Sequence, residues 1–263
     1  MISMKNKVKY LDPLSPEKWP EKLKNNKFQL FLDYDGTLAP FNENPDKAYP
    51  IDKTNQVIRD YLKNNIPVAI VTGRNALDIR NKFIKPIVPV IGLHGREFLP
   101  AEQDEPIKIG PEVKTIPDKL LKKIIEINEN YPVKLEQKNN SYAIHIKNNS
   151  NLQEIIYHTL NKILINQNFN DNWEFISGRK VIELRPADWN KGNAVKKYRD
   201  SDIMAIYIGD DRTDEDVFEI LSEPCINIYV KNEDKKLDTK ANFYLDSPAD
   251  VINFLKILMD THL

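Results

Sequence analysis

Residues 31–41 read FLDYDGTLAPF, a stretch that sets two carboxylates, Asp33 and Asp35, on either side of a single tyrosine. The pair stands where an apolar run ends and a Gly-Thr turn begins. Carboxylates this close disfavour each other's ionisation, so the pair must be solvated, neutralised by a cation or sharing a proton. Each option places the pair either in a surface turn or in a site that does chemistry.

Three other polar stretches follow this pair along the chain. They are Thr72-Gly73-Arg74, the turn WNKGN around Lys191, and the acidic stretch GDDRTDED at 209–216. Taken alone, each has an ordinary structural explanation as a turn, a helix cap, an acidic first helical turn or a solvated lysine. Open α/β sheets, however, bind ligands at the carboxyl ends of their strands. Polar groups that recur in this order at predicted strand ends therefore favour a chemical site.

Short apolar runs precede most of these polar groups. Their continuous rather than alternating apolar character is typical of strands buried on both faces, as in a parallel sheet. Helical patterns lie between them, at 53–64 and 75–83. The alternation predicts a doubly wound α/β core. The runs are FQLFL at 28–32, VAIV at 68–71, VPVI at 88–91 and AIYI at 205–208.

The middle third of the chain has a different pattern. Helices predicted at 117–130 and 152–164 carry apolar residues at helical spacing, and two short strand candidates follow each helix. We therefore predict an inserted α+β cap at 107–185, with the core formed by 1–106 and 186–263. The strand candidates are 133–137, 142–146, 173–176 and 181–184, with a hairpin turn at Asn139-Asn140.

Composition narrows the classes of partner. With 38 basic and 39 acidic residues among 263, the net charge of -1 gives no field that would attract nucleic acid or an anionic membrane. Cys225 is the only cysteine, which excludes an internal disulfide and suits a reducing compartment. No stretch approaches the roughly 20 apolar residues of a membrane span. We expect a soluble, cytoplasmic and monomeric protein. Its expected partner is a small molecule.

The four polar stretches resemble the motifs of the haloacid-dehalogenase-type (HAD) phosphohydrolases. The matching residues are Asp33-x-Asp35-Gly36-Thr37, then Thr72, then Lys191, then Gly209-Asp210-Asp211 with Asp214 and Asp216. The resemblance implies a HAD-like core spanning about residues 28 to 245. It also implies that an insert between the second and third motifs is the cap of a sugar-phosphate phosphatase.

The residue types suit this chemistry, since hydrolysis of a phosphate monoester needs a nucleophile, a proton donor and positive charge. Asp33 is the candidate nucleophile, forming an aspartyl-phosphate, and Asp35 is the candidate acid and base. Thr72 and Lys191 would bind the phosphoryl oxygens. The family implies Mg²⁺ as cofactor, held by the carboxylates of Asp33 and Asp210 and the backbone carbonyl of Asp35, with Asp211 or Asp214 holding metal-bound water or orienting Lys191.

Other stretches are similar to the trehalose-6-phosphate phosphatases. They are GLHGRE at 92–97, EQK at 136–138, GRKVIELRP at 178–186, and the extended motif GDDRTDEDVF. The resemblance implies that trehalose 6-phosphate is the substrate, that Glu136, Lys138, Arg179 and Glu183 bind sugar hydroxyls, and that Arg74 and His94 lie near the phosphate.

Several alternatives stay open at this point. The cap charges could be solvated surface pairs, and His145 and His158 have the pattern of ordinary polar-face residues. The substrate could be another sugar phosphate, such as sucrose 6-phosphate or mannosylglycerate phosphate. The aspartyl-phosphate could pass to a second sugar, as in a phosphomutase. A non-catalytic sugar-phosphate sensor could use the same fold.

Overall fold

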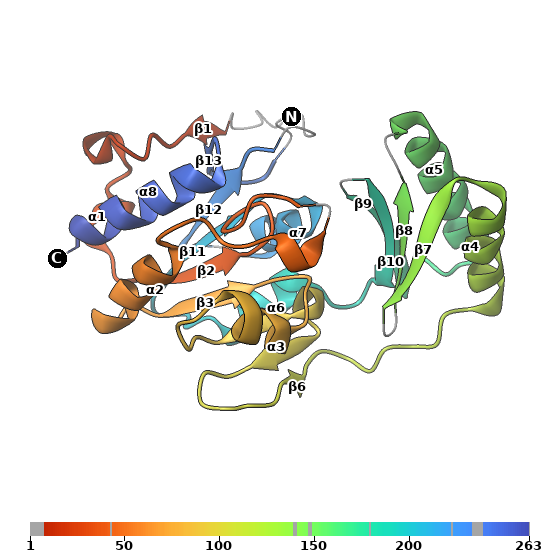
Figure 1. Ribbon diagram of the computed structural model, residues 1–263, viewed down its shortest axis with the longest axis horizontal. Coiled ribbons are helices and arrows are strands. Elements are labelled where there is room, and N and C mark those ends of the chain that lie inside the picture. The colour runs from red at the N-terminus through yellow and green to blue at the C-terminus, as the bar shows by residue number, and fades with distance from the viewer. Residues whose placement is uncertain are drawn as a thin grey trace. The chain divides into compact units, whose positions relative to one another are not determined.

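Figure 1 shows the computed structural model of the chain, which describes residues 8–42, 44–138, 141–146, 149–178, 180–221, 223–232 and 239–262. The chain divides into two compact units. Unit 1 contains Met1–Gly110 and Asn190–Leu263, and unit 2 contains Pro111–Trp189. The joins lie within a few residues of the boundaries that the sequence predicts.

Unit 1 is built on a sheet that has nine strands in the described part of the chain, in the order β1-β13-β12-β11-β2-β3-β4-β5-β6. Neighbours from β1 to β4 run parallel, and β5 and β6 extend the sheet antiparallel. The predicted parallel α/β core is confirmed. The strands are β1 (Lys9–Tyr10), β2 (Phe28–Asp33), β3 (Val68–Val71), β4 (Val90–Gly92), β5 (Glu97–Leu99), β6 (Ile107–Lys108), β11 (Met204–Gly209), β12 (Cys225–Val230) and β13 (Phe243–Leu245).

The chain changes its direction of travel across this sheet beside β2. It first moves outward from β2 to β3 and β4, and it later returns to β11 on the opposite side of β2 before continuing to β12 and β13. Ligands of open α/β sheets bind at such a switch point, at the carboxyl ends of the strands. Strands β2 and β11 are buried over their whole length, which explains their continuous apolar runs.

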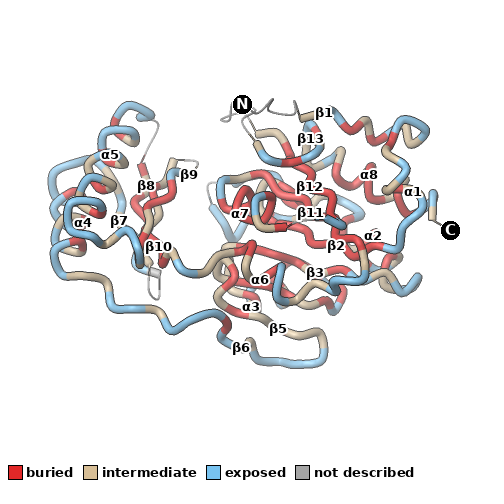
Figure 2. The backbone as a smooth tube through the Cα atoms, turned by 180° about the vertical axis from the view of Figure 1, so that it is seen from behind, coloured by how far each residue is buried: buried red, intermediate tan, exposed pale blue. Residues whose placement is uncertain are grey.

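Helices cover both faces of the sheet of unit 1. Helix α2 contacts α8, while α6 contacts α7, and the two pairs lie on opposite faces (Figures 1 and 2). The helix predicted at 75–83 begins as α3 but widens into a π-helical turn, η3 (Ile79–Phe83), in which the Ile84 N–H donates to Ile79 O at 2.9 Å. The helices are α1 (Lys22–Asn25), α2 (Thr54–Lys63), α3 (Ala76–Asp78), α6 (Lys191–Tyr198), α7 (Arg212–Ile220) and α8 (Pro248–Asp260), with short 3-10 turns η1 (Pro16–Lys18), η2 (Pro45–Lys47) and η4 (Leu93–Gly95).

Unit 2 has an antiparallel sheet in the order β7-β8-β10-β9, packed against two helices. Ile144 and Ile182 of the sheet share one buried cluster with Leu120 and Ile124 of the first helix and Leu160 of the second. The helix-strand-strand pattern predicted twice is therefore confirmed, and the predicted turn at 139–140 lies outside the described residues. The elements are α4 (Asp118–Asn130), β7 (Val133–Lys138), β8 (Ser141–Ile146), α5 (Ser150–Asn166), β9 (Trp173–Gly178) and β10 (Val181–Pro186).

Among the described residues, every helix is too short or too polar to cross a membrane.

Candidate active site

The side chain of Lys191 bonds two aspartates, Asp33 and Asp214, that lie far apart in the sequence. Lys191 is the first residue of α6, whose start is fixed by Asn190, because the Asn190 side chain accepts the Asn193 N–H while the Asn193 side chain accepts the Asn190 N–H. The Lys191 Nζ lies 2.7 Å from Asp33 Oδ1, at the end of β2, and 2.9 Å from Asp214 Oδ1. Only 2% of the Lys191 side chain is exposed, and the two carboxylates hold its ammonium in place.

Asp214 is held by donors from three directions besides Lys191. The Tyr207 hydroxyl donates to Asp214 Oδ1 at 2.6 Å. The backbone N–H groups of Asp210 and Asp211 donate to Asp214 Oδ2 at 2.9 and 3.0 Å. Asp211 caps α7 by accepting the Thr213 and Asp214 N–H groups. The strand-to-helix turn after β11 is thereby locked around Asp214.

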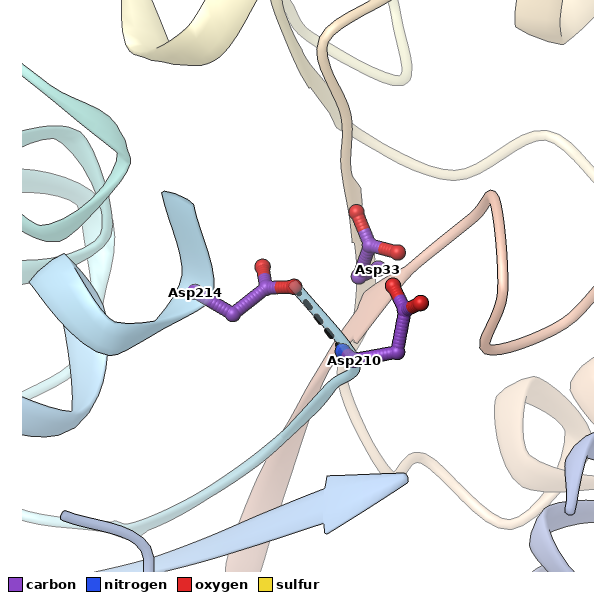
Figure 3. Close-up of side chains that lie close together, drawn as sticks. All are labelled: Asp33, Asp210 and Asp214. Atoms are coloured by element: carbon purple, nitrogen blue, oxygen red, sulfur yellow. Dashed lines mark hydrogen bonds between the residues drawn. The ribbon is translucent and has the colours of Figure 1, made fainter. Parts of the chain in front are cut away.

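Three carboxylates gather at the switch point of the sheet. Asp33, Asp210 and Asp214 each present one oxygen, and these oxygens all lie within 4.8 Å of one another. Figure 3 shows the three side chains close together, with Asp210 N–H bonded to Asp214. The backbone at Gly36, which has φ +79°, lies close against the Asp210 carboxylate. A Cβ added at Gly36 would lie 2.1 Å from Asp210 Oδ2, so this position requires a residue without a side chain.

The electrostatics of this cluster favour a bound cation. Burial, with neighbouring carboxylates, raises the pKa of Asp33 and of Asp210 well above the usual range. Burial opposes the charge on Lys191, but Asp214 and Asp33 outweigh it and raise the pKa of Lys191. One ammonium thus faces several buried carboxylates, and hard oxygen donors in this number fit a divalent cation such as Mg²⁺.

Asp35 lies on the same turn as Asp33, but its carboxylate is engaged elsewhere. Arg74 Nε donates to Asp35 Oδ2 at 2.7 Å, and Arg74 Nη2 donates to Asp35 Oδ1 at 2.5 Å. About 40% of the Asp35 side chain is exposed, against 5% for Asp33. Asp35 is therefore accessible to a substrate while its orientation is fixed.

Thr72 and His94 stand at the ends of β3 and β4. Thr72 is fully buried, and its Oγ1 accepts the Arg74 N–H at 3.1 Å. The His94 N–H donates to Thr72 O at 3.1 Å, in a left-handed conformation with φ 53°. A Cβ at Gly73 would lie 2.4 Å from the His94 ring, so the missing side chain lets the ring cover this turn.

The remaining predicted residues lie in unit 2. Glu136 of β7 and Glu183 of β10 both pair with Ala143 of β8, so they share one face of the sheet. Lys138 ends β7 and its side chain is not described, and Arg179 lies outside the described residues. His145 also lies on this face, with its Nε2 2.7 Å from Glu136 Oε2.

Sequence reasoning missed two residues that support the carboxylates of unit 1. Tyr207, which bonds Asp214, lies inside an apolar run and has the pattern of a core aromatic residue. Asn232 follows the end of β12, and its Nδ2 donates to Asp210 O at 2.9 Å and to Asp210 Oδ2 at 3.3 Å. Inspecting the residues after every strand end would have found Asn232, whereas no signal in the sequence distinguishes Tyr207.

The sequence around this site also matches a known protein family. The model of the family described as trehalose-phosphatase matches residues 31–249. The chain belongs to the trehalose-phosphatase family. The resemblance stated from the motifs is confirmed, and membership makes the chain an enzyme, a phosphoric monoester hydrolase.

Curated relatives in the trehalose-phosphatase family include plant proteins. Probable trehalose-phosphate phosphatase 4 of Oryza sativa subsp. japonica is 31% identical over 254 residues, covering 91% of this chain and 68% of the relative. Trehalose-phosphate phosphatase B of Arabidopsis thaliana is 30% identical over 258 residues, covering 90% and 67%. The solved C-terminal domain of the C. albicans trehalose-6-phosphate phosphatase has a TM-score of 0.78 at 22% identity, covering 96% of this chain and 98% of that one, and so shares the fold.

Proposed function

We propose that this enzyme hydrolyses trehalose 6-phosphate to trehalose and phosphate through an aspartyl-phosphate on Asp33. The observation that carries the proposal is the buried contact of Lys191 with Asp33 and Asp214 beside Asp210. Membership of the trehalose-phosphatase family and the names of the plant relatives support the choice of substrate.

In the first step, a carboxylate oxygen of Asp33 attacks phosphorus, and the bond from phosphorus to the sugar oxygen breaks. Asp35 donates a proton to that leaving oxygen. In the second step, Asp35 takes a proton from a water molecule that attacks the aspartyl-phosphate, which releases phosphate and restores Asp33. Lys191 and Thr72 hold the phosphoryl oxygens by charge and by hydrogen bond.

The carboxylates of Asp33 and Asp210, with the backbone carbonyl of Asp35, would hold Mg²⁺. When bound, this cation supplies positive charge that reduces the repulsion between the Asp33 carboxylate and the phosphate. Asp214 orients Lys191, consistent with its hydrogen bond to the ammonium, and Asp211 supports the same turn through its cap on α7.

We assign substrate specificity to unit 2, acting as a cap. Glu136 and Glu183 share a sheet face on which paired hydroxyl groups of a disaccharide could be bound, and Lys138 and Arg179 complete the proposed set. Arg74 and His94 belong to the phosphate side of the site. The expected partner is a small-molecule sugar phosphate, and the expected location is the cytoplasm, where the single cysteine suits reducing conditions.

The test is phosphate release from trehalose 6-phosphate beside glucose 6-phosphate, sucrose 6-phosphate and mannosylglycerate phosphate, with Mg²⁺ and then with a chelator. We expect a metal-dependent preference for trehalose 6-phosphate, and a loss of at least about a thousandfold in Asp33→Asn. Asp202→Asn, at an exposed position, is the matched control and should keep wild-type turnover. Preference for another ester would overturn the substrate, and activity retained in Asp33→Asn would overturn the covalent step.

A further inference from the structure

The contact between Arg74 and Asp35 suggests a different task for Arg74 than phosphate binding. Two parallel hydrogen bonds join the Nε and Nη2 edge of the guanidinium to both carboxylate oxygens of Asp35. We propose that Arg74 is a positioning residue that aims the Asp35 carboxylate at the leaving oxygen of the substrate. The inference rests on the proposed function, in which Asp35 is the acid and base.

Arg74 is itself held on the sides that Asp35 does not occupy. Its Nη1 donates to Pro45 O at 2.7 Å. The guanidinium carbon lies 5.1 Å from the centre of the Tyr34 ring and 4.9 Å from that of the Phe83 ring, within the range of cation–π contacts. Only 14% of the Arg74 side chain is exposed. A guanidinium held by a backbone carbonyl and by two neighbouring aromatic rings can impose its own orientation on a bonded carboxylate.

Asp35 depends on this contact more than Arg74 does. Within the described residues, no other side chain donates a hydrogen bond to the Asp35 carboxylate. If Arg74 turned the same edge to a phosphate, it would give up both bonds to Asp35 and leave that carboxylate without an orienting donor. Planar, two-pronged contacts between guanidinium and carboxylate fix direction as well as charge. The observed arrangement therefore serves the proton-transfer residue.

The test compares a series of substituted phenyl phosphates, from 4-nitrophenyl to unsubstituted phenyl phosphate, in wild type and in Arg74→Met. Poor leaving groups need a proton in the transition state, whereas 4-nitrophenolate leaves without one. We expect Arg74→Met to lower kcat/KM about a hundredfold for phenyl phosphate and less than about threefold for 4-nitrophenyl phosphate. A residue that binds the phosphoryl group would instead lower kcat/KM by the same factor across the series.

A second measurement separates positioning from loss of folded structure. In an Asp35→Asn background, adding Arg74→Met should lower kcat/KM for phenyl phosphate by less than about twofold, because a residue that acts through Asp35 no longer has a proton-transfer group to position. An undiminished cost in that background would overturn the inference. Arg74→Lys should have a kcat/KM for phenyl phosphate between those of wild type and Arg74→Met, since an ammonium cannot form the two parallel hydrogen bonds of a guanidinium. Arg59→Met, at an exposed position on α2, is the control and should have the kcat/KM of wild type.

The same experiments keep the two proposals apart. A wild-type chain that releases no phosphate from any ester overturns the proposed function, and the inference with it. A wild type that is active, with a uniform loss across the phenyl phosphates in Arg74→Met, overturns the inference alone.

Discussion

Replacing Lys191 by Met removes the single ammonium that bonds both Asp33 and Asp214 while keeping most of the volume of its stem. The side chains of all three residues are at most 5% exposed, so water cannot compensate the two carboxylates. Breaking a buried ion pair by removing one partner costs about 3–5 kcal/mol. We expect Lys191→Met to lower the free energy of unfolding by that amount at neutral pH with a chelator present.

Mg²⁺ should reduce this penalty. A cation bound beside Asp33 and Asp210 supplies positive charge close to the position that Lys191 vacates, so it stabilises the variant more than the wild type. We expect saturating Mg²⁺ to reduce the difference in free energy of unfolding between wild type and Lys191→Met by at least about 1 kcal/mol.

The assay is urea unfolding at pH 7.5, followed by both circular dichroism and tryptophan fluorescence, with chelator and then with Mg²⁺. Lys196→Met, exposed on the same helix, is the control and should lie within about 0.5 kcal/mol of wild type. A Lys191→Met variant as stable as the control in chelator would refute the electrostatic reasoning. If Mg²⁺ left the difference in free energy of unfolding between wild type and Lys191→Met unchanged, the cation would bind somewhere other than this carboxylate cluster.

Three further outcomes are expected. Gly36→Ala should weaken Mg²⁺ binding about tenfold to a hundredfold in a calorimetric titration, because its Cβ would displace the Asp210 carboxylate; wild-type affinity would show that the turn adapts. Tyr207→Phe should lower the free energy of unfolding by about 1–3 kcal/mol, since it removes the buried donor to Asp214, and an unchanged urea midpoint would contradict this. Burial raises the pKa of Cys225 to about 12, so its thiol stays protonated at neutral pH; Ellman's reagent should label it only after unfolding, and rapid labelling of the native chain would contradict the burial.

The fold and the carboxylate site could be predicted because both depend on local patterns. Continuous apolar runs mark buried parallel strands, and the first polar residue after each run lies at the edge where ligands bind. That reasoning reached Asp33, Thr72 and Asp210 without any knowledge of contacts. Their roles in catalysis remain predictions.

What could not be predicted depends on which side chains meet in three dimensions. Nothing near Arg74 in the sequence indicates that its guanidinium bonds Asp35, since the two residues follow the ends of the neighbouring strands β2 and β3 and meet only in the folded chain. His145 has an ordinary alternating position in its strand, and its contact with Glu136 arises from the pairing of β7 with β8. The widening at Ile79–Phe83 is likewise invisible to a periodicity that fits an ordinary helix.

The position of β2 in the sheet has a consequence for how the molecule is made. One neighbour of β2, β3, follows it closely in the chain, but the other, β11, is synthesised only after the whole of unit 2. Until then, one edge of a fully buried strand has no hydrogen-bonding partner, which is a template for aggregation. Unit 2, with its own sheet and core, can fold during this interval. A chain that ends before residue 204 therefore lacks the strand that pairs with this edge of β2.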